Sequence, residues 1–426
     1  MNRPVSPIAN PAYRRYWLAR FLTVMATSGM VVVIGYQLYD LARGRYHMSI
    51  AAAGLQLGIL GLVQFVPVVA LSPLAGVVAD RFDRRMVAGI GVMADFCVAA
   101  ALAAATMLGL VTLPLLYVLA ALHGVVRVFV APAQSAIAPN IVPTEQLPQA
   151  IAMGAIAFQG GSVAGPALGG LLFAQAAGAP YALAGLFLLA ASLLLLSLPP
   201  VPAPPDNRRS HPLRQMLDGF SFVLGHRFLL GCVTLDLFAV LLAGATALLP
   251  VFARDILTID GHPVGAYGLG LMRAAPAAGA ALVALVLSRW PLARNVGVKM
   301  LWSVAVYGAA TVAFGLSRNF AASLALLSIL GAADMVSVFI RSTLIQLHTP
   351  DAVRGRVSAI TTIFVSASNE LGEMESGLAV ALFGATGAVL FGGVAAIVIT
   401  GLWAWLFPEI RRARTFAVPE NLGVKS

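Results

Sequence analysis

The sequence predicts an all-α membrane protein with twelve transmembrane helices in two pseudo-symmetric six-helix halves. Of its 426 residues, 60% are hydrophobic and only 10% are charged, whereas soluble globular proteins carry about 25% charged residues. Apolar runs follow one another along the chain, and the mean hydropathy is +0.90. One long polar, proline-rich stretch divides these runs into two equal sets. This composition excludes a disordered chain, a collagen, a disulfide scaffold and an ordinary cytosolic enzyme.

Twelve segments are apolar and long enough to cross a bilayer, which requires about 20 helical residues. Glycine and proline occur inside several of them, and membrane helices tolerate both because neighbouring helices satisfy the freed backbone groups. The segments are 16–39, 50–79, 86–109, 112–134, 147–175, 180–200, 227–252, 264–288, 295–316, 320–347, 356–383 and 386–408.

The polar stretch PPVPAPPDNRRSHPLRQ (199–215) predicts a domain boundary, because its proline content favours a stiff, extended linker. The residues 212–226 predict a short interfacial helix that leads into the seventh span. We therefore expect an N-terminal six-helix bundle over 1–200, a cytoplasmic linker and interfacial helix over 201–226, and a C-terminal six-helix bundle over 227–426.

The two halves also resemble each other weakly in sequence. VVADRFDRR (77–85) follows the second span, and VLSRWPLAR (286–294) follows the eighth span. Repeated six-helix halves are typical of one class of secondary transporter. The repeat therefore indicates a carrier.

The placement of lysine and arginine predicts the orientation. If the N-terminus is cytoplasmic, only Arg43, Arg45, Arg254 and Arg318 of the 27 Lys and Arg residues fall in loops on the opposite side. Most of the others fall in the cytoplasmic loops and termini, as the positive-inside rule requires. Both termini are therefore expected in the cytoplasm. Membrane topology also explains the net charge of +10, so we expect no nucleic-acid partner.

Motifs for catalysis, cofactors or metals are missing from the sequence, so we expect neither an enzyme nor a cofactor. It contains no GxxxxGK[ST] phosphate loop for ATP. The two cysteines lie inside apolar runs, and the six histidines are scattered without metal-site spacing. The N-terminus shows no short apolar core followed by a cleavage site, so we expect no removed signal peptide.

The loop after the second span carries the sharpest local motif, and we interpret it as a conformational latch. Glycine allows close helix packing at Gly76, and an acid flanked by arginines at a membrane edge can pair with nearby helix ends. The pattern is similar to the loop signature between the second and third helices of the major facilitator superfamily, and that resemblance implies the latch role. Its residues are Gly76, Asp80, Arg81, Arg84 and Arg85.

The fifth span carries glycines four residues apart, which line one helix face and allow tight contact with another helix. A packing face is therefore one role of this segment. The pattern GxxxGPxxGG also resembles the antiporter motif of the same superfamily, which occurs in exporters. The residues of this antiporter-motif helix are Gly161, Gly165, Pro166, Gly169 and Gly170.

Nearly the whole chain resembles the enterobactin (siderophore) exporter subfamily of the major facilitator superfamily. The similar segments are NPAYRRYWLARF (10–21), GVVADRFDRR (76–85), GSVAGPALGGLL (161–172), LLSLPPVPAPP (195–205), HPLRQMLDGFSFVL (211–224) and RGRVSAI (354–360). The resemblance implies a proton-coupled secondary exporter that works by alternating access in a bacterial inner membrane. We expect a siderophore as its small-molecule cargo, protons as the coupling ion, and a monomer.

Ionisable residues inside the spans are the candidate site, because a charge at bilayer depth costs at least about 2.5–3.5 kcal/mol unless it is paired. Family geometry places the first, fourth, seventh and tenth helices around a central cavity. The substrate-cavity candidates are Arg20, His123, Arg127 and Arg341; the acids near mid-span include Asp95, Asp236 and Asp334. Structural ion pairs between helices are the alternative role for each of them.

The eleventh span contains three carboxylates within six residues, Glu370, Glu373 and Glu375. Ionised carboxylates so close together repel in a low dielectric, so one of them should hold a proton near neutral pH. We expect Glu373 to be the proton-coupling group, followed by Asp236, Glu370 and Asp334. Alternatively, one of the glutamates pairs with the latch region.

Two other functions stay open. Macrolide and multidrug efflux pumps share much of this pattern, and a lipophilic or cationic drug would depend on aromatic surface and on the acids. A non-transporting sensor or scaffold with the same fold is the second alternative, although a passive bundle has little reason to carry buried charges.

Overall fold

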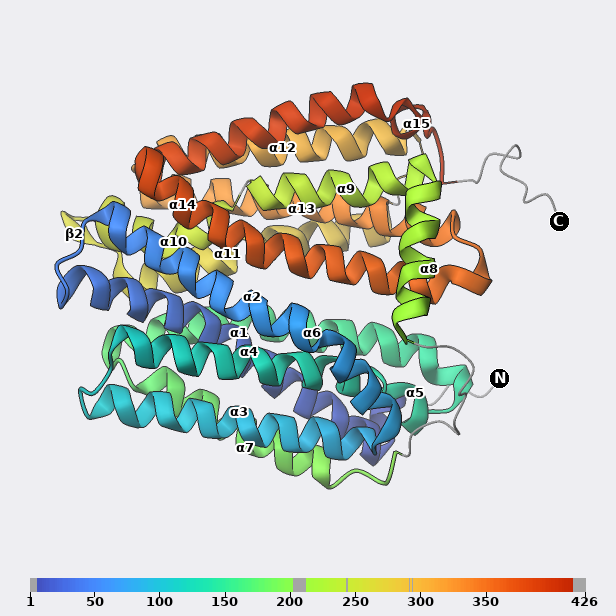
Figure 1. Ribbon diagram of the computed structural model, residues 1–426, viewed down its shortest axis with the longest axis horizontal. Helices are drawn as coiled ribbons and strands as arrows, with labels where there is room; N and C mark the ends of the chain where they lie inside the picture. The colour runs from blue at the N-terminus through green and yellow to red at the C-terminus, as the bar shows by residue number, and fades with distance from the viewer. Residues whose placement is uncertain (1–5, 202–211, 243, 291, 293, 417–426) are drawn as a thin grey trace. The chain divides into compact units, whose positions relative to one another are not determined.

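The structure is a computed structural model that describes residues 6–201, 212–242, 244–290, 292 and 294–416. It is 86% helical, which confirms the predicted all-α class. In the first part of the chain the elements are η1 Pro7–Ala9, α1 Pro11–Gly44, α2 Ile50–Arg81, α3 Arg84–Met107, α4 Leu113–Ser135, α5 Ala138–Ile141, η2 Thr144–Gln146, α6 Leu147–Gln175 and α7 Ala179–Leu196 (Figure 1).

The second part of the chain begins with α8, at Pro212. Its elements are α8 Pro212–Gly225, α9 Arg227–Leu242, η3 Ala245–Leu248, α10 Leu249–Val251, η4 Phe252–Ile256, β1 Thr258–Ile259, β2 His262–Pro263, α11 Gly265–Arg289, α12 Val296–Leu316, α13 Phe320–Leu347, α14 Asp351–Leu406 and α15 Pro408–Arg412. The strands β1 and β2 pair antiparallel around Asp260 and Gly261, which both have positive φ as a tight hairpin turn requires.

The helices begin where the sequence places short polar residues before an apolar run. The side chains of Asn10, Ser49, Asp83, Thr112 and Asn319 each accept a hydrogen bond from a backbone N–H of the first turn of α1, α2, α3, α4 and α13. These caps satisfy backbone donors that the helix leaves without an internal partner. Local sequence therefore sets the start of these five long helices.

Among the described residues, eleven helices are long and apolar enough to cross a membrane. The last of them, Leu371–Leu406, spans 36 residues, and Gly384 interrupts it with φ 71° and ψ 171°, a conformation that favours glycine. In Figure 1 the chain runs along α14 in orange and returns in red toward α15. The element α14, which starts at Asp351, therefore contains the eleventh predicted span and most of the twelfth.

The chain forms two compact units. Unit 1 contains the described residues of Met1–Arg209 and Leu249–Ala274, and unit 2 contains those of Ser210–Leu248 and Ala275–Ser426. Residues 249–274, from the end of the seventh span to the start of the eighth, therefore pack with the first half of the chain. The unit boundaries differ in this respect from the predicted bundles 1–200 and 227–426.

A helix is present as α8 where the sequence predicts a short helix over 212–226; its interfacial position stays a prediction. It packs against α14, where a side chain in place of Gly219 would lie 3.0 Å from Cβ of Arg356. The rings of Phe220 and Phe364 stack with their centroids 6.2 Å apart. The central part of the predicted linker, 202–211, lies outside the described residues.

In unit 1, glycines hold α1 and α6 in close contact, as the sequence predicted for a packing face. A Cβ on Gly161 would lie 2.9 Å from the backbone nitrogen of Met25, and a Cβ on Gly169 would lie 3.0 Å from Val33. A Cβ on Gly165 would lie 3.0 Å from the backbone nitrogen of Gly29, and closer still to the Met25 carbonyl oxygen. Small residues at these positions let the two backbones approach each other.

We expect Gly165→Ala to lower the thermal stability of the purified protein, because the added methyl group has no room beside α1. Overpacking of this kind costs about 1–3 kcal/mol. Gly154→Ala is the matched control, since a Cβ at Gly154 on the same helix has nothing within 4 Å. The melting temperature in detergent measures both variants, and equal values for them would contradict the prediction.

Candidate functional site

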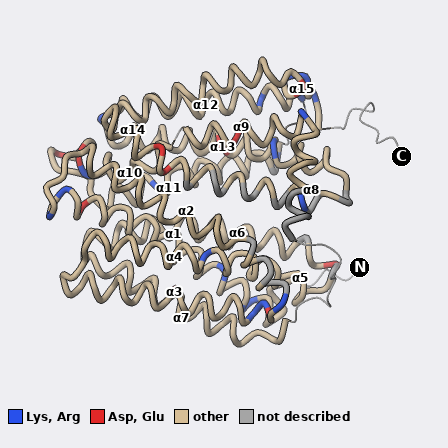
Figure 2. The backbone as a smooth tube through the Cα atoms, in the orientation of Figure 1, with Lys and Arg blue, Asp and Glu red and all other residues tan. Residues whose placement is uncertain are grey.

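The charged residues of each unit lie mainly near the helix ends, and few lie along the helix middles (Figure 2). Those few are the exceptions that a membrane protein tolerates only when they are paired or functional. The ion pairs among these few residues make one group in unit 2 and one pair in unit 1. A further charged group lies at the Gly44 end of α1.

The group in unit 2 joins α9 to α13, and we name Asp236, Asp334 and Arg341 the acid–arginine cluster. Arg341 Nη1 and Asp236 Oδ1 form an ion pair, and the two side chains are only 7% and 10% exposed. The two residues are 105 positions apart in sequence, on spans seven and ten. A charge-assisted bond in such a buried place is strong.

Asp334 lies two turns before Arg341 on the same helix, close enough to interact electrostatically with both Asp236 and Arg341. Tyr307 of α12 also lies close enough to interact electrostatically with the two acids. The cluster therefore contains two carboxyl groups and one guanidinium group, so one carboxyl group has no equivalent positive partner within it. Such an excess acid can hold a proton in a buried site.

Of the three carboxylates in the eleventh span, the structure describes the side chains of Glu373 and Glu375, and both are half-buried. The side chain of Glu370 lies outside the described residues. Nearby, Ser376 donates a hydrogen bond to the Gly244 carbonyl oxygen, so this part of α14 packs on the chain that follows α9. The coupling role of Glu370 and Glu373 stays a prediction.

In unit 1, His123 of α4 contacts Asp95 of α3, and we name these residues the histidine–aspartate pair. His123 Nδ1 lies 2.6 Å from Asp95 Oδ1, and the side chains are 0% and 2% exposed. The other cavity candidates of unit 1 are Arg20 on α1 and Arg127 on α4. Arg20 donates to the Tyr16 hydroxyl at 2.9 Å, and Arg127 is exposed. The structure therefore pairs His123 with Asp95 and Arg20 with Tyr16.

The latch motif is organised around Asp83, which the sequence analysis did not select. Asp83 caps α3 and forms an ion pair with Arg85 at 3.0 Å. Arg85 also donates to the Leu198 carbonyl oxygen at 2.6 Å, and Arg84 reaches the Ala136 carbonyl oxygen at 3.4 Å. The arginines thus bind the carbonyl ends of α7 and α4, where a positive charge complements the helix dipole.

The remaining latch residues are described only in part. Arg81 is exposed at the end of α2. Gly76 lies within α2, and the side chain of Asp80, the acid of the motif, lies outside the described residues. The latch role stays a prediction.

A third charged group, which the sequence analysis did not select, joins α1 to η4, and we name it the charged junction. It consists of Tyr39, Asp40, Arg43, Arg254 and Asp255. Arg43 binds both carboxylate oxygens of Asp255, at 3.1 and 3.2 Å, and the Tyr39 hydroxyl donates to Asp255 at 2.5 Å. Arg254 forms an ion pair with Asp40 at 2.8 Å.

The charged junction ties residues 249–274 to α1, because η4 supplies both Arg254 and Asp255. The element η4 is a single π-helical turn, and such turns are frequent at functional sites. The sequence signal that could have revealed the junction is a pair of opposite charges in each partner segment, Asp40 and Arg43 three residues apart and Arg254 and Asp255 adjacent. Within unit 1, α1 and η4 therefore meet through two ion pairs.

We expect Asp255→Ala to loosen the charged junction, because it removes the acceptor of both Arg43 and Tyr39. Backbone amides of residues 39–44 and 252–257 should exchange hydrogen at least about tenfold faster, since local opening sets the exchange rate. Asp260→Asn in the exposed hairpin turn is the control. Unchanged exchange in Asp255→Ala, measured by mass spectrometry, would show that the junction does not hold the segment.

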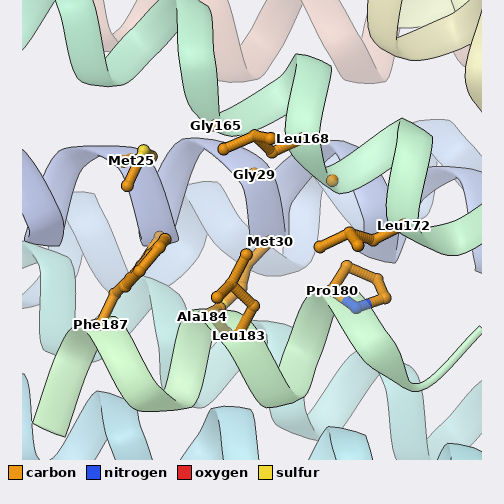
Figure 3. A pocket seen from close by; sticks show the side chains of 12 residues that line it. Met25, Gly29, Met30, Gly165, Leu168, Leu172, Pro180, Leu183, Ala184 and Phe187 are labelled. Carbon is orange, nitrogen blue, oxygen red and sulfur yellow. The ribbon is translucent and has the colours of Figure 1, made fainter.

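A pocket in unit 1 lies among α1, α6 and α7 beside the close contact of Gly29 and Gly165. Figure 3 shows Met30, Leu172 and Phe187 around it. All of its lining residues are apolar: Met25, Ala26, Gly29, Met30, Gly165, Leu168, Gly169, Leu172, Pro180, Leu183, Ala184 and Phe187. It offers no charged donor, so it does not suit an anionic cargo.

The apolar helices and the buried charge pairs together define a multi-pass membrane transporter. The sequence matches the family profile of the Major Facilitator Superfamily over residues 16–373. The chain belongs to that superfamily. The predicted family and fold are therefore confirmed.

Curated relatives include the enterobactin exporters EntS of Shigella boydii serotype 18 and Escherichia coli O139:H28. Each is 29% identical over 420 residues, which cover 95% of this chain and 94% of the relative. This similarity extends over both halves and the linker region. It therefore supports the predicted resemblance to the enterobactin exporter subfamily.

Solved structures of transporters share the fold. A bacterial homolog of the human lysosomal transporter Spinster, in an inward-facing and unoccupied conformation, matches with a TM-score of 0.70 and 17% identity, over 94% of this chain and 97% of that one. A D-xylose–proton symporter matches with a TM-score of 0.70 and 14% identity, over 95% and 98%. At these identities the likeness shows the fold alone.

Proposed function

We propose that this transporter is a proton-coupled secondary exporter of a siderophore that works by alternating access. The acid–arginine cluster carries the proposal, because it places two carboxyl groups and one guanidinium group in the buried part of unit 2. One acid can gain and lose a proton while Arg341 stays paired with the other. Glu373 and Glu370 on the eleventh span are further coupling candidates.

The cargo follows from the relatives and from the chemistry of the candidate residues. The curated relatives that are 29% identical over 95% of the chain are named enterobactin exporters. A catecholate siderophore is an anion, and a desolvated anion requires charge-assisted donors. Arg20, Arg127 and Arg341 are the proposed donors, and the antiporter-motif helix α6 favours export.

The remaining features of the proposal are topological. The protein acts as a monomer in a bacterial inner membrane with both termini in the cytoplasm. The halves 1–200 and 227–426 alternate, joined by 201–226, and the latch residues bias the two conformations. The glycine contacts of α6 keep α1 and α6 together during this movement.

Expression in an Escherichia coli strain that lacks its own enterobactin exporter tests the cargo. Under iron limitation we expect secreted enterobactin to rise and intracellular enterobactin to fall, relative to an equally expressed Arg341→Met variant. Unchanged secretion together with a gain of macrolide resistance would overturn the siderophore assignment and support the drug-efflux alternative.

A further inference from the structure

The histidine–aspartate pair lies in the middle of two spans, where a charged side chain is costly. His123 is 0% exposed, Asp95 is 2% exposed, and their nearest polar atoms are 2.6 Å apart. Among the described residues, nothing bonds to the other ring nitrogen, His123 Nε2, although it is buried. A buried polar atom without a partner requires an explanation, because it costs about 1–3 kcal/mol.

The helices that pack against α3 and α4 are α1, α2 and α7. The stretch of α2 from Ile50 to Ala79 contains no titratable residue, and the only titratable residue of α7 is Tyr181, which donates to Gln37 at 2.7 Å. The titratable and charged groups of these elements are Tyr13, Arg14, Arg15, Tyr16, Arg20, Tyr36, Tyr39, Asp40 and Arg43 on α1, Asp80 and Arg81 on α2, and Tyr181 on α7.

The helices α3 and α4 themselves add few other groups: Arg84, Arg85 and Cys97 on α3, and Tyr117 and Arg127 on α4. Tyr117 donates to Gln56, and Cys97 and Arg127 are exposed. Within the part of the chain that the structure describes, no second ion pair reaches Asp95. Among the described residues, the ion pair of Asp95 is therefore with His123.

The hydrogen-bond geometry defines two protonation states. In the first, a neutral imidazole donates its Nδ1–H to the Asp95 carboxylate, and the pair has a net charge of −1. In the second, the Nε2 lone pair has formed a bond to a proton taken from water, and imidazolium and carboxylate together are neutral. Release breaks that N–H bond and returns the proton to water. Asp95 supports this cycle because its carboxylate stays beside Nδ1 in both states.

We propose that the Asp95–His123 pair is a proton-binding site of the transport cycle and that it loads at His123 Nε2. The proposal rests on the proton-coupled function proposed above and adds a site in unit 1 to the acid–arginine cluster of unit 2. It assigns His123 to proton binding, in place of the cargo-contact role expected from the sequence.

Close packing beside the pair explains why proton access must change during transport. Gly124 follows His123, and a Cβ there would lie 3.3 Å from the Gln64 carbonyl oxygen of α2. At this level α2 and α4 are in close backbone contact, and Nε2 is itself buried in this structure. A proton reaches Nε2 only when the packing around it opens, so loading depends on conformation.

Nitrogen NMR of the full-length protein with ¹⁵N-labelled histidine tests proton binding without any cargo. The His123 signals are those that vanish in His123→Gln, and the exposed His262 is an internal control. Between pH 9 and pH 5 we expect His123 to change from the Nδ1–H tautomer to the doubly protonated ring. A His123 signal that stays neutral throughout, while His262 titrates, would overturn the proposal.

Enterobactin-driven proton movement in proteoliposomes tests the role in transport. The double variant Asp95→Asn/His123→Gln keeps two hydrogen-bonding side chains of similar shape without titration, so it should fold while losing at least about half of the proton movement per cargo. The control His262→Gln should keep it. Wild-type proton movement in the folded double variant would overturn the transport role. No proton movement in the wild type would instead refute the proposed function, and the NMR titration would still decide whether the pair binds a proton.

Discussion

Replacing Arg341 with methionine is expected to abolish transport and to destabilise unit 2. Asp236 would keep a buried carboxylate, 10% exposed, without its ion-pair partner. Removing one partner of a buried pair costs about 3–5 kcal/mol, because the remaining charge has no compensation. Thermal unfolding in detergent and enterobactin efflux from proteoliposomes measure the two effects. Arg294→Met is the control, because Arg294 is exposed.

The double variant Asp236→Asn/Arg341→Met separates structure from function. It removes both charges, so most of the lost stability should return. Transport should stay absent, because neither a cargo-binding guanidinium nor the paired acid remains. Normal efflux in this double variant would show that the ion pair has only a structural role.

The second large effect is expected from Asp334→Asn, which should still bind cargo but lose export against a gradient. Asparagine keeps the size of the side chain and its hydrogen bonding but cannot carry a proton. The acid–arginine cluster has two carboxyl groups for one guanidinium group. Asp334 can therefore gain and lose a proton while Arg341 stays paired with Asp236. Cargo binding, uphill efflux and cargo-driven proton movement are measured together in proteoliposomes.

Glu373→Gln is the decisive comparison for that experiment, since the eleventh span was the first choice from the sequence. Asp260→Asn in the exposed hairpin is the matched control for loss of a carboxylate. If Glu373→Gln loses uphill export while Asp334→Asn keeps it, coupling belongs to the eleventh span. If both variants export at the wild-type rate, neither acid carries the coupling proton.

The sequence by itself determined the class of protein, the spans and the family. Hydropathy depends on composition within about 20 residues, so the apolar runs predicted the membrane helices without any knowledge of their packing. The same local information predicted α8, because a polar, proline-rich stretch precedes it. Glycine spacing on α6 predicted a packing face, because residues four apart share one side of a helix.

Only the tertiary structure decided which charges meet. Asp236 pairs with Arg341 across 105 residues, Asp95 with His123 across 28, and Asp40 with Arg254 across 214. Nor did the sequence show that Asp83 binds Arg85, or that residues 249–274 pack with the first half of the chain. Local composition predicts on which helix a charged residue lies and at what depth in the membrane. Its partner depends on the rotation and packing of helices far apart in sequence, and those are set by side-chain contacts throughout each unit.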